Sequence, residues 1–90
     1  MGAIGVIRVS GKQTFTLLNE LFPSKNLLEQ ASHTIVVGLL KDQDKVLDEV
    51  VLSLFKGPKS YTGEDVIEIS CHGSAYIQSQ IIALLHLPSS

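Results

Sequence analysis

Four stretches of the chain alternate apolar and polar residues or form short apolar runs, the patterns that predict β-strands. They cover residues 3–10, 33–41, 45–55 and 65–71. The second and third stretches are joined by Asp42-Gln43-Asp44, a polar link typical of a hairpin turn, so these two strands are expected to pair antiparallel. Gly57, Pro58 and Gly63 mark the loop that leads into the fourth stretch.

Two other stretches carry apolar residues at intervals of three and four, the spacing of an amphipathic helix. In the first, these residues are Phe15, Leu18, Leu21 and Phe22. Ser10 with Gln13 fits a capping box at the start of this helix, and Pro23 marks its end. In the second helix, the residues are Ile77, Ile81, Leu84 and Leu85. Ser74 fits its N-cap and Pro88 marks its end.

The resulting order, β-α-β-β-β-α, predicts an α+β unit in which two helices cover one face of a mixed sheet. Residues 24–32 are too weakly patterned to predict more than a loop. Several strands, above all residues 45–55, carry apolar residues on both faces. We therefore expect a second copy of the chain, or a further domain, to cover the other face of the sheet.

The composition fits a single folded domain over residues 1–90. Hydrophobic residues make up 44% and charged residues 18%, and a chain of this length is too short to form a second core. The formal net charge of -2 disfavours a domain that binds nucleic acid by itself. No apolar run is long enough to span a membrane and no signal-peptide pattern is present, so we expect a cytoplasmic protein. Cys71 is the only cysteine, which excludes an internal disulfide and a thiolate metal cluster within one chain.

Glu68 stands inside the apolar run from Val66 to Ile69, where a carboxylate is costly unless it is paired or hydrogen-bonded. Arg8 raises the same question, because it shares a strand face with apolar neighbours. The two side chains could pair with each other, or Glu68 could lie on an edge strand. Alternatively, a ligand supplies the partner groups. The strand pattern alone leaves these possibilities open.

No catalytic or metal site is predicted. Cys71 and His72 are adjacent, and neighbours along a strand point to opposite faces, so we do not expect a nucleophile and its base. The segment Gly57-Pro58-Lys59-Ser60 lacks the spacing of a phosphate-binding loop, so no nucleoside triphosphate site is predicted. Glu64 and Asp65 lie at a loop-to-strand junction, where they are expected to accept hydrogen bonds from turn amides.

Several motifs occur together in an order that resembles a known family. They are Gly5-Val6-Ile7-Arg8-Val9-Ser10-Gly11, Asp48-Glu49-Val50, Ser60-Tyr61-Thr62-Gly63-Glu64-Asp65-Val66-Ile67-Glu68 and His72-Gly73. Over about residues 2–88 the chain is similar to the N-terminal domain of the bacterial and organellar tRNA-modification GTPases called MnmE or TrmE.

This resemblance implies a fold related to the tetrahydrofolate-binding domain of aminomethyltransferases, with two copies pairing to complete the folate-binding unit. It also implies a part in modifying the wobble uridine of tRNA, with 5-formyl- or 5,10-methylene-tetrahydrofolate as one-carbon donor and a flavin-dependent partner protein. The family's GTP, potassium and magnesium belong to a GTPase domain that is expected to lie outside this chain, as is the helical domain. This chain alone is therefore not expected to hydrolyse GTP.

The folate contacts that the resemblance implies fall on Arg8 and Glu68. A carboxylate can accept two hydrogen bonds from the amino-pyrimidine edge of a pterin, and an arginine can donate to oxygen atoms of the folate. Two alternatives remain. One is a purely structural dimerisation module in which Arg8 and Glu68 pair with each other. The other is a stand-alone one-carbon transferase similar to the aminomethyltransferases, for which the chain is too short.

Overall fold

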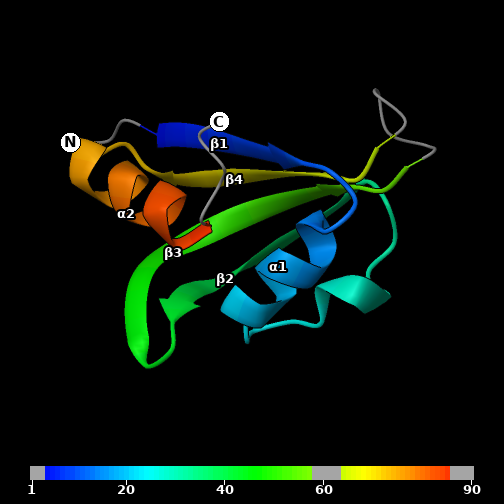
Figure 1. Ribbon diagram of the computed structural model, residues 1–90, viewed down its shortest axis with the longest axis horizontal. Coiled ribbons are helices and arrows are strands. Elements are labelled where there is room, and N and C mark those ends of the chain that lie inside the picture. The colour runs from blue at the N-terminus through cyan, green and yellow to red at the C-terminus, as the bar shows by residue number, and fades with distance from the viewer. Residues whose placement is uncertain (1–3, 58–63, 86–90) are drawn as a thin grey trace.

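The structure is a computed structural model, and it describes residues 4–57 and 64–85. The elements are β1 (Ile4–Ser10), α1 (Thr14–Leu21), a short 3-10 turn (Leu27–Glu29), β2 (Thr34–Asp42), β3 (Lys45–Phe55), β4 (Val66–His72) and α2 (Ala75–Leu85). The four strands form one sheet, and both helices lie on the same face of it (Figure 1). The predicted α+β class and the order of the elements are confirmed.

The sheet has the order β1-β4-β3-β2, and each neighbouring pair of these strands is antiparallel. The expectation of a mixed sheet is therefore wrong for the described strands. The chain leaves β1 through α1 and returns at the far edge as β2, so β1 is free to pair with β4, which runs in the opposite direction. The predicted hairpin is confirmed, with Gln43 at a φ of 56° in the turn between β2 and β3.

The core lies between the sheet and the two helices. The strands contribute alternate buried residues to it, namely Ile7, Val9, Val36, Leu40, Val50, Leu52, Leu54, Ile67, Ile69 and Cys71. The helices contribute Phe15 and Leu18 of α1, Phe22 at its end, and Ile81 and Leu85 of α2. This period of two along the strands leaves the intervening residues on the face that carries no helix.

The start of α1 differs from the predicted capping box. Ser10 is still paired in the β1–β4 ladder, and α1 begins only at Thr14, after Gln13, with no capping hydrogen bond from a side chain. Gly11 turns the chain between them with a φ of 133°, a conformation that residues with a side chain rarely adopt. Its N–H donates to the backbone oxygen of Asp65, so the strand ladder continues where the sequence predicts a helix cap.

The start of α2 agrees with the sequence prediction. The Ser74 hydroxyl oxygen accepts hydrogen bonds from the N–H groups of Tyr76 and Ile77 at 3.1 and 3.3 Å. These bonds satisfy amides that have no partner within the helix. Pro88, predicted to end this helix, lies outside the described residues.

Gly38 of β2 lies directly beneath the end of α1. A Cβ atom at this position would be 2.5 Å from Ser24 Oγ and 2.7 Å from Phe22 Cζ. Phe22 is fully buried and cannot swing away, so we expect Gly38→Ala to lower the free energy of unfolding by about 1–3 kcal/mol in urea denaturation.

Gly5→Ala is the matched control for Gly38→Ala. The three atoms nearest to a Cβ at Gly5 all belong to the side chain of Gln78, which is long and half-buried and can move aside. We therefore expect a smaller loss of stability at Gly5. A larger loss at Gly5 than at Gly38 would contradict this description of the packing.

Candidate functional site

The candidate site lies on the face of the sheet that carries no helix, called here the open face. The strand register places Arg8 of β1 directly opposite Glu68 of β4, and Ser53 of β3 directly opposite Glu68 on its other side. Directly opposite residues have Cβ atoms about 4.5–5.5 Å apart. Arg8, Glu68 and Ser53 therefore form a line across three strands, which we call the polar row.

The position of Glu68 answers the question that its sequence context raised. Its strand β4 is an inner strand of the sheet, so Glu68 is not on an edge. Its neighbours in the strand, Ile67 and Ile69, point into the core, while Glu68 is half-buried on the open face. Arg8 is exposed, and within residues 4–57 and 64–85 no ion pair or hydrogen bond joins it to Glu68. Both charged groups can therefore reach a ligand placed on this face.

Exposed apolar side chains lie on the same face as the polar row, on the edge strands β1 and β2. The exposed ones on the open face are Ile4, Val6, Ile35, Val37 and Leu39. Val37 is 54% exposed and Ile35 is 66% exposed, although both belong to a regular strand of the sheet. The five residues lie on the two edge strands of the sheet, and a sheet face with this many exposed apolar residues indicates a surface for binding.

A second polar cluster joins β3 to the end of β4. The Asp48 carboxylate accepts a hydrogen bond from the N–H of His72 at 2.9 Å, and its other oxygen is 2.6 Å from Nδ1 of the same residue. This contact depends on how β3 and β4 lie side by side in the sheet, so it could not be recognised in the sequence. Cys71 is buried and its Sγ lies 3.6 Å from the Gly5 backbone oxygen, whereas the adjacent His72 is exposed.

The environment of Cys71 disfavours its thiolate form. Burial, and secondarily the negative charge of Asp48, raise the pKa of the Cys71 thiol. A thiol with a raised pKa is a poor nucleophile at neutral pH. Cys71 is therefore a packing residue in the core.

Asp65 has the role that the sequence predicted for it. Its Oδ1 accepts a hydrogen bond from the N–H of Gly57 at 2.9 Å, across the loop between β3 and β4. Ser60 to Gly63, the first part of the longest motif, lies outside the described residues.

Comparison with known proteins assigns the chain to a family. The family model described as "GTP-binding protein TrmE N-terminus" matches residues 1–88. The chain belongs to this family. The resemblance seen in the sequence motifs is thus confirmed, and the chain corresponds to the N-terminal domain that the model describes.

Relatives of the chain carry the name "tRNA modification GTPase MnmE". The protein from Flavobacterium johnsoniae is 58% identical over 87 residues, which are 93% of this chain and 19% of the relative. The protein from Cytophaga hutchinsonii is 54% identical over 85 residues, which are 94% of this chain and 18% of the relative. The chain thus spans about a fifth of the length of these relatives.

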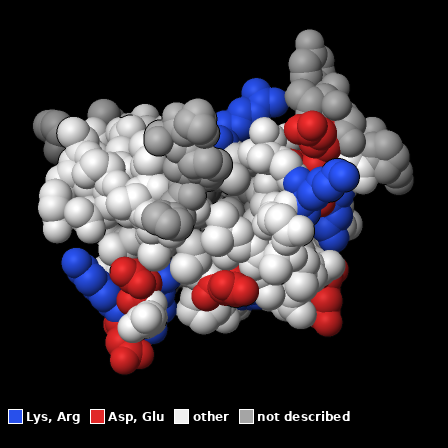
Figure 2. Space-filling view, viewed as in Figure 1, with Lys and Arg blue, Asp and Glu red and all other residues white. Residues whose placement is uncertain are grey.

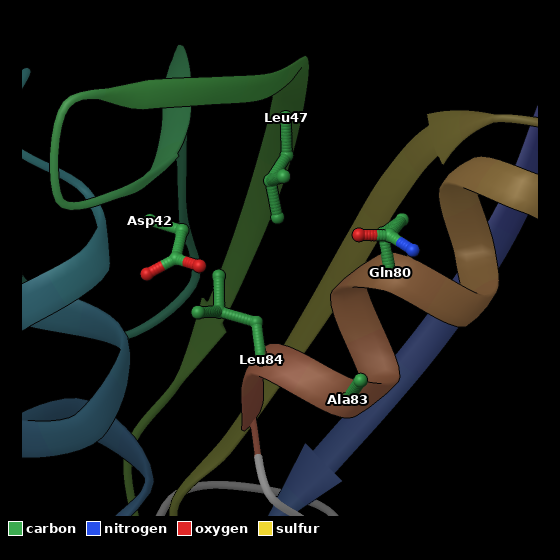
Figure 3. Close-up of a pocket in the computed structure, with 5 residues that line it drawn as sticks. All are labelled: Asp42, Leu47, Gln80, Ala83 and Leu84. Atoms are coloured by element: carbon green, nitrogen blue, oxygen red, sulfur yellow. The ribbon is translucent and has the colours of Figure 1, made fainter.

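Two shallow hollows in this TrmE-type domain lie away from the polar row. The first, of about 390 Å³, lies between the β2–β3 hairpin and α2, where Asp42 and Leu47 face Gln80, Ala83 and Leu84 (Figure 3). The second, of about 380 Å³, is lined by Lys12, Gly57, Glu64 and Asp65. Neither contains Arg8 or Glu68, so the residues that the family resemblance implies lie on the open face and not in these hollows.

The charges of the domain are mixed in sign. Figure 2 shows the side of the molecule on which the helices lie, where most of the described surface is uncharged and groups of opposite sign lie together near the hairpin.

Among the described residues, no group of three or more His, Cys, Asp or Glu is arranged to hold a metal ion. Neither α1 nor α2 is long and apolar enough to cross a membrane.

Proposed function

We propose that this chain is a folate-binding and dimerising domain that acts in the modification of the wobble uridine of tRNA. A reduced folate, 5-formyl- or 5,10-methylene-tetrahydrofolate, binds on the open face and carries the one-carbon unit. Membership of the TrmE family and the names of the relatives support the tRNA-modifying role. The relation to the aminomethyltransferase fold remains a prediction.

The observation that carries this proposal is the position of Arg8 opposite Glu68 on a face that is otherwise partly apolar. A carboxylate that is half-buried and has no partner within the described part of the chain is well placed to accept hydrogen bonds from a ligand. The pterin edge supplies two such donors, and the apolar neighbours provide contact area for the ring. Bonds to a charged group are the stronger class of hydrogen bond, so Glu68 orients the pterin.

A second copy of the chain covers the exposed apolar residues of the open face. Isologous pairing suits this role, because in a two-fold dimer the same patch serves both partners. The folate then lies where the two copies meet, and the second copy excludes water from the Glu68 carboxylate, which strengthens its hydrogen bonds.

The other activities of the family depend on the remaining four-fifths of the relatives' length. We assign to that part the binding of GTP, with potassium and magnesium, and contacts with tRNA and a flavin-dependent partner protein. A cytoplasmic location is consistent with this role.

Substitution of Val37 tests the dimer. Val37→Asp would bury an unpaired charge in the interface, which costs several kcal/mol. We expect sedimentation velocity at tens of micromolar to show a dimer for the unaltered chain and a monomer for Val37→Asp. Thr16→Asp, on the exposed side of α1, is the matched control and should remain dimeric.

A strictly monomeric unaltered chain would contradict the pairing of two copies. Repeating the sedimentation with 5-formyltetrahydrofolate, and following its absorbance, shows whether the folate travels with the dimer. A dimer that carries no folate would favour the purely structural module over the folate-binding domain.

A further inference from the structure

Ser53 is the member of the polar row to which neither the sequence motifs nor the family resemblance gives a role. It lies two residues before the end of β3, directly opposite Glu68, and its side chain is half-buried on the open face. Within residues 4–57 and 64–85 its hydroxyl makes no hydrogen bond. A hydroxyl can donate one hydrogen bond and accept others, so Ser53 has an unused donor beside the carboxylate of Glu68.

The chemistry of the polar row can be compared with that of a 2-amino-4-oxopyrimidine edge. This edge, which pterins share with guanine, presents two N–H donors with an acceptor on either side: the carbonyl oxygen and a ring nitrogen. The polar row presents a carboxylate that accepts two bonds, with Arg8 as donor on one side and Ser53 as donor on the other. The order of donors and acceptors in the row is therefore complementary to that of the ring edge.

We infer that Ser53 contacts the bound pterin, donating a hydrogen bond to the ring acceptor that lies on the β3 side of Glu68. This inference rests on the proposed folate binding and adds a third contact to it. Arg8 donates to the ring acceptor on the β1 side. The polar row therefore makes hydrogen bonds along the whole amino-pyrimidine edge of the pterin. The orientation of the pterin ring is thus determined by the register of β1, β4 and β3.

Ser70 provides a control on the same face of the sheet. It follows Glu68 by two residues on the same strand and the same face, is half-buried like Ser53, and also lacks a hydrogen bond to the described residues. Its cross-strand neighbours, however, are Val6 and Val51, so it lies outside the polar row by roughly 6.6–6.8 Å along the strand. A general effect of removing a hydroxyl from the open face would appear at both serines, whereas the proposed contact belongs to Ser53 alone.

Calorimetric titration of the 90-residue chain with 5-formyltetrahydrofolate tests the inference. We expect Ser53→Ala to raise the Kd about fivefold to tenfold, the effect of one neutral hydrogen bond. Ser70→Ala should stay close to the Kd of the unaltered chain, and Ser53→Thr, which keeps the hydroxyl, should restore most of the affinity. Urea denaturation of each variant establishes that it is folded.

The outcomes separate this inference from the proposal on which it rests. No binding by the unaltered chain overturns both. Binding by the unaltered chain and by Ser53→Ala with equal affinity overturns the role of Ser53 alone, as does an equal loss at Ser53 and Ser70. Guanosine presents the same edge without the rest of the folate, so competition by guanosine as strong as that by 5-formyltetrahydrofolate would overturn the assignment of the row to a folate.

Discussion

Phe22→Ala is expected to lower the free energy of unfolding by about 3–5 kcal/mol, the range observed when a buried phenylalanine is replaced by alanine. Phe22 is fully buried just after α1, and its ring lies above Gly38 of β2. The substitution leaves a cavity beneath the helix that the fixed backbone of β2 cannot fill. Because small domains are stable by about 5–15 kcal/mol, this loss is a large fraction of the total.

Urea denaturation followed by circular dichroism measures the effect of Phe22→Ala. Tyr76→Ala is the matched control, since Tyr76 is an aromatic residue that is 63% exposed on α2. Its removal should change the free energy of unfolding by less than about 1 kcal/mol. Similar losses for the two variants would contradict the position given to α1 over the sheet.

Glu68→Ala is expected to weaken the binding of 5-formyltetrahydrofolate about tenfold to a hundredfold, which corresponds to roughly 1.5–3 kcal/mol. The carboxylate accepts two hydrogen bonds from the pterin in the proposed complex, and alanine leaves those two N–H donors without a partner. The expected loss is larger than that at Ser53, because bonds to a charged group exceed those to a neutral hydroxyl.

Calorimetry on the folded variants measures this effect. Glu49→Ala is the control, because Glu49 is a carboxylate on the same face whose cross-strand neighbour is Leu39, outside the polar row. Its Kd should match that of the unaltered chain. An unchanged Kd for Glu68→Ala would remove Glu68 from the folate site.

The local elements of this domain could be predicted from the sequence, since the apolar period of each segment determines whether it can bury a strand face or a helix stripe. The β2–β3 hairpin and the Ser74 cap involve residues close in the chain, and both are confirmed. The capping box at Ser10 failed because β1 pairs with a distant strand through this residue. At Ser10, strand pairing with β4 therefore outweighs the local preference of this residue for a helix N-cap.

The candidate site could be predicted only in part. Arg8 and Glu68 were recognised as charges in apolar strands, and the family resemblance linked them. Their direct opposition, and the place of Ser53 beside them, follow from the β1–β4 and β3–β4 registers. Register depends on contacts between segments that are far apart in the chain, so the period of two shows which face a residue occupies but not which residue it faces.

The central claim is that a reduced folate binds at the polar row of the open face, and an amide chemical-shift map by NMR locates the ligand directly. On addition of 5-formyltetrahydrofolate, we predict that the largest shifts fall on Arg8, Ser53 and Glu68 and on their neighbours in β1, β3 and β4. Shifts that gather instead around Asp42 and Gln80, at the hollow between the hairpin and α2, would contradict the claim, as would the absence of any shift at saturating folate.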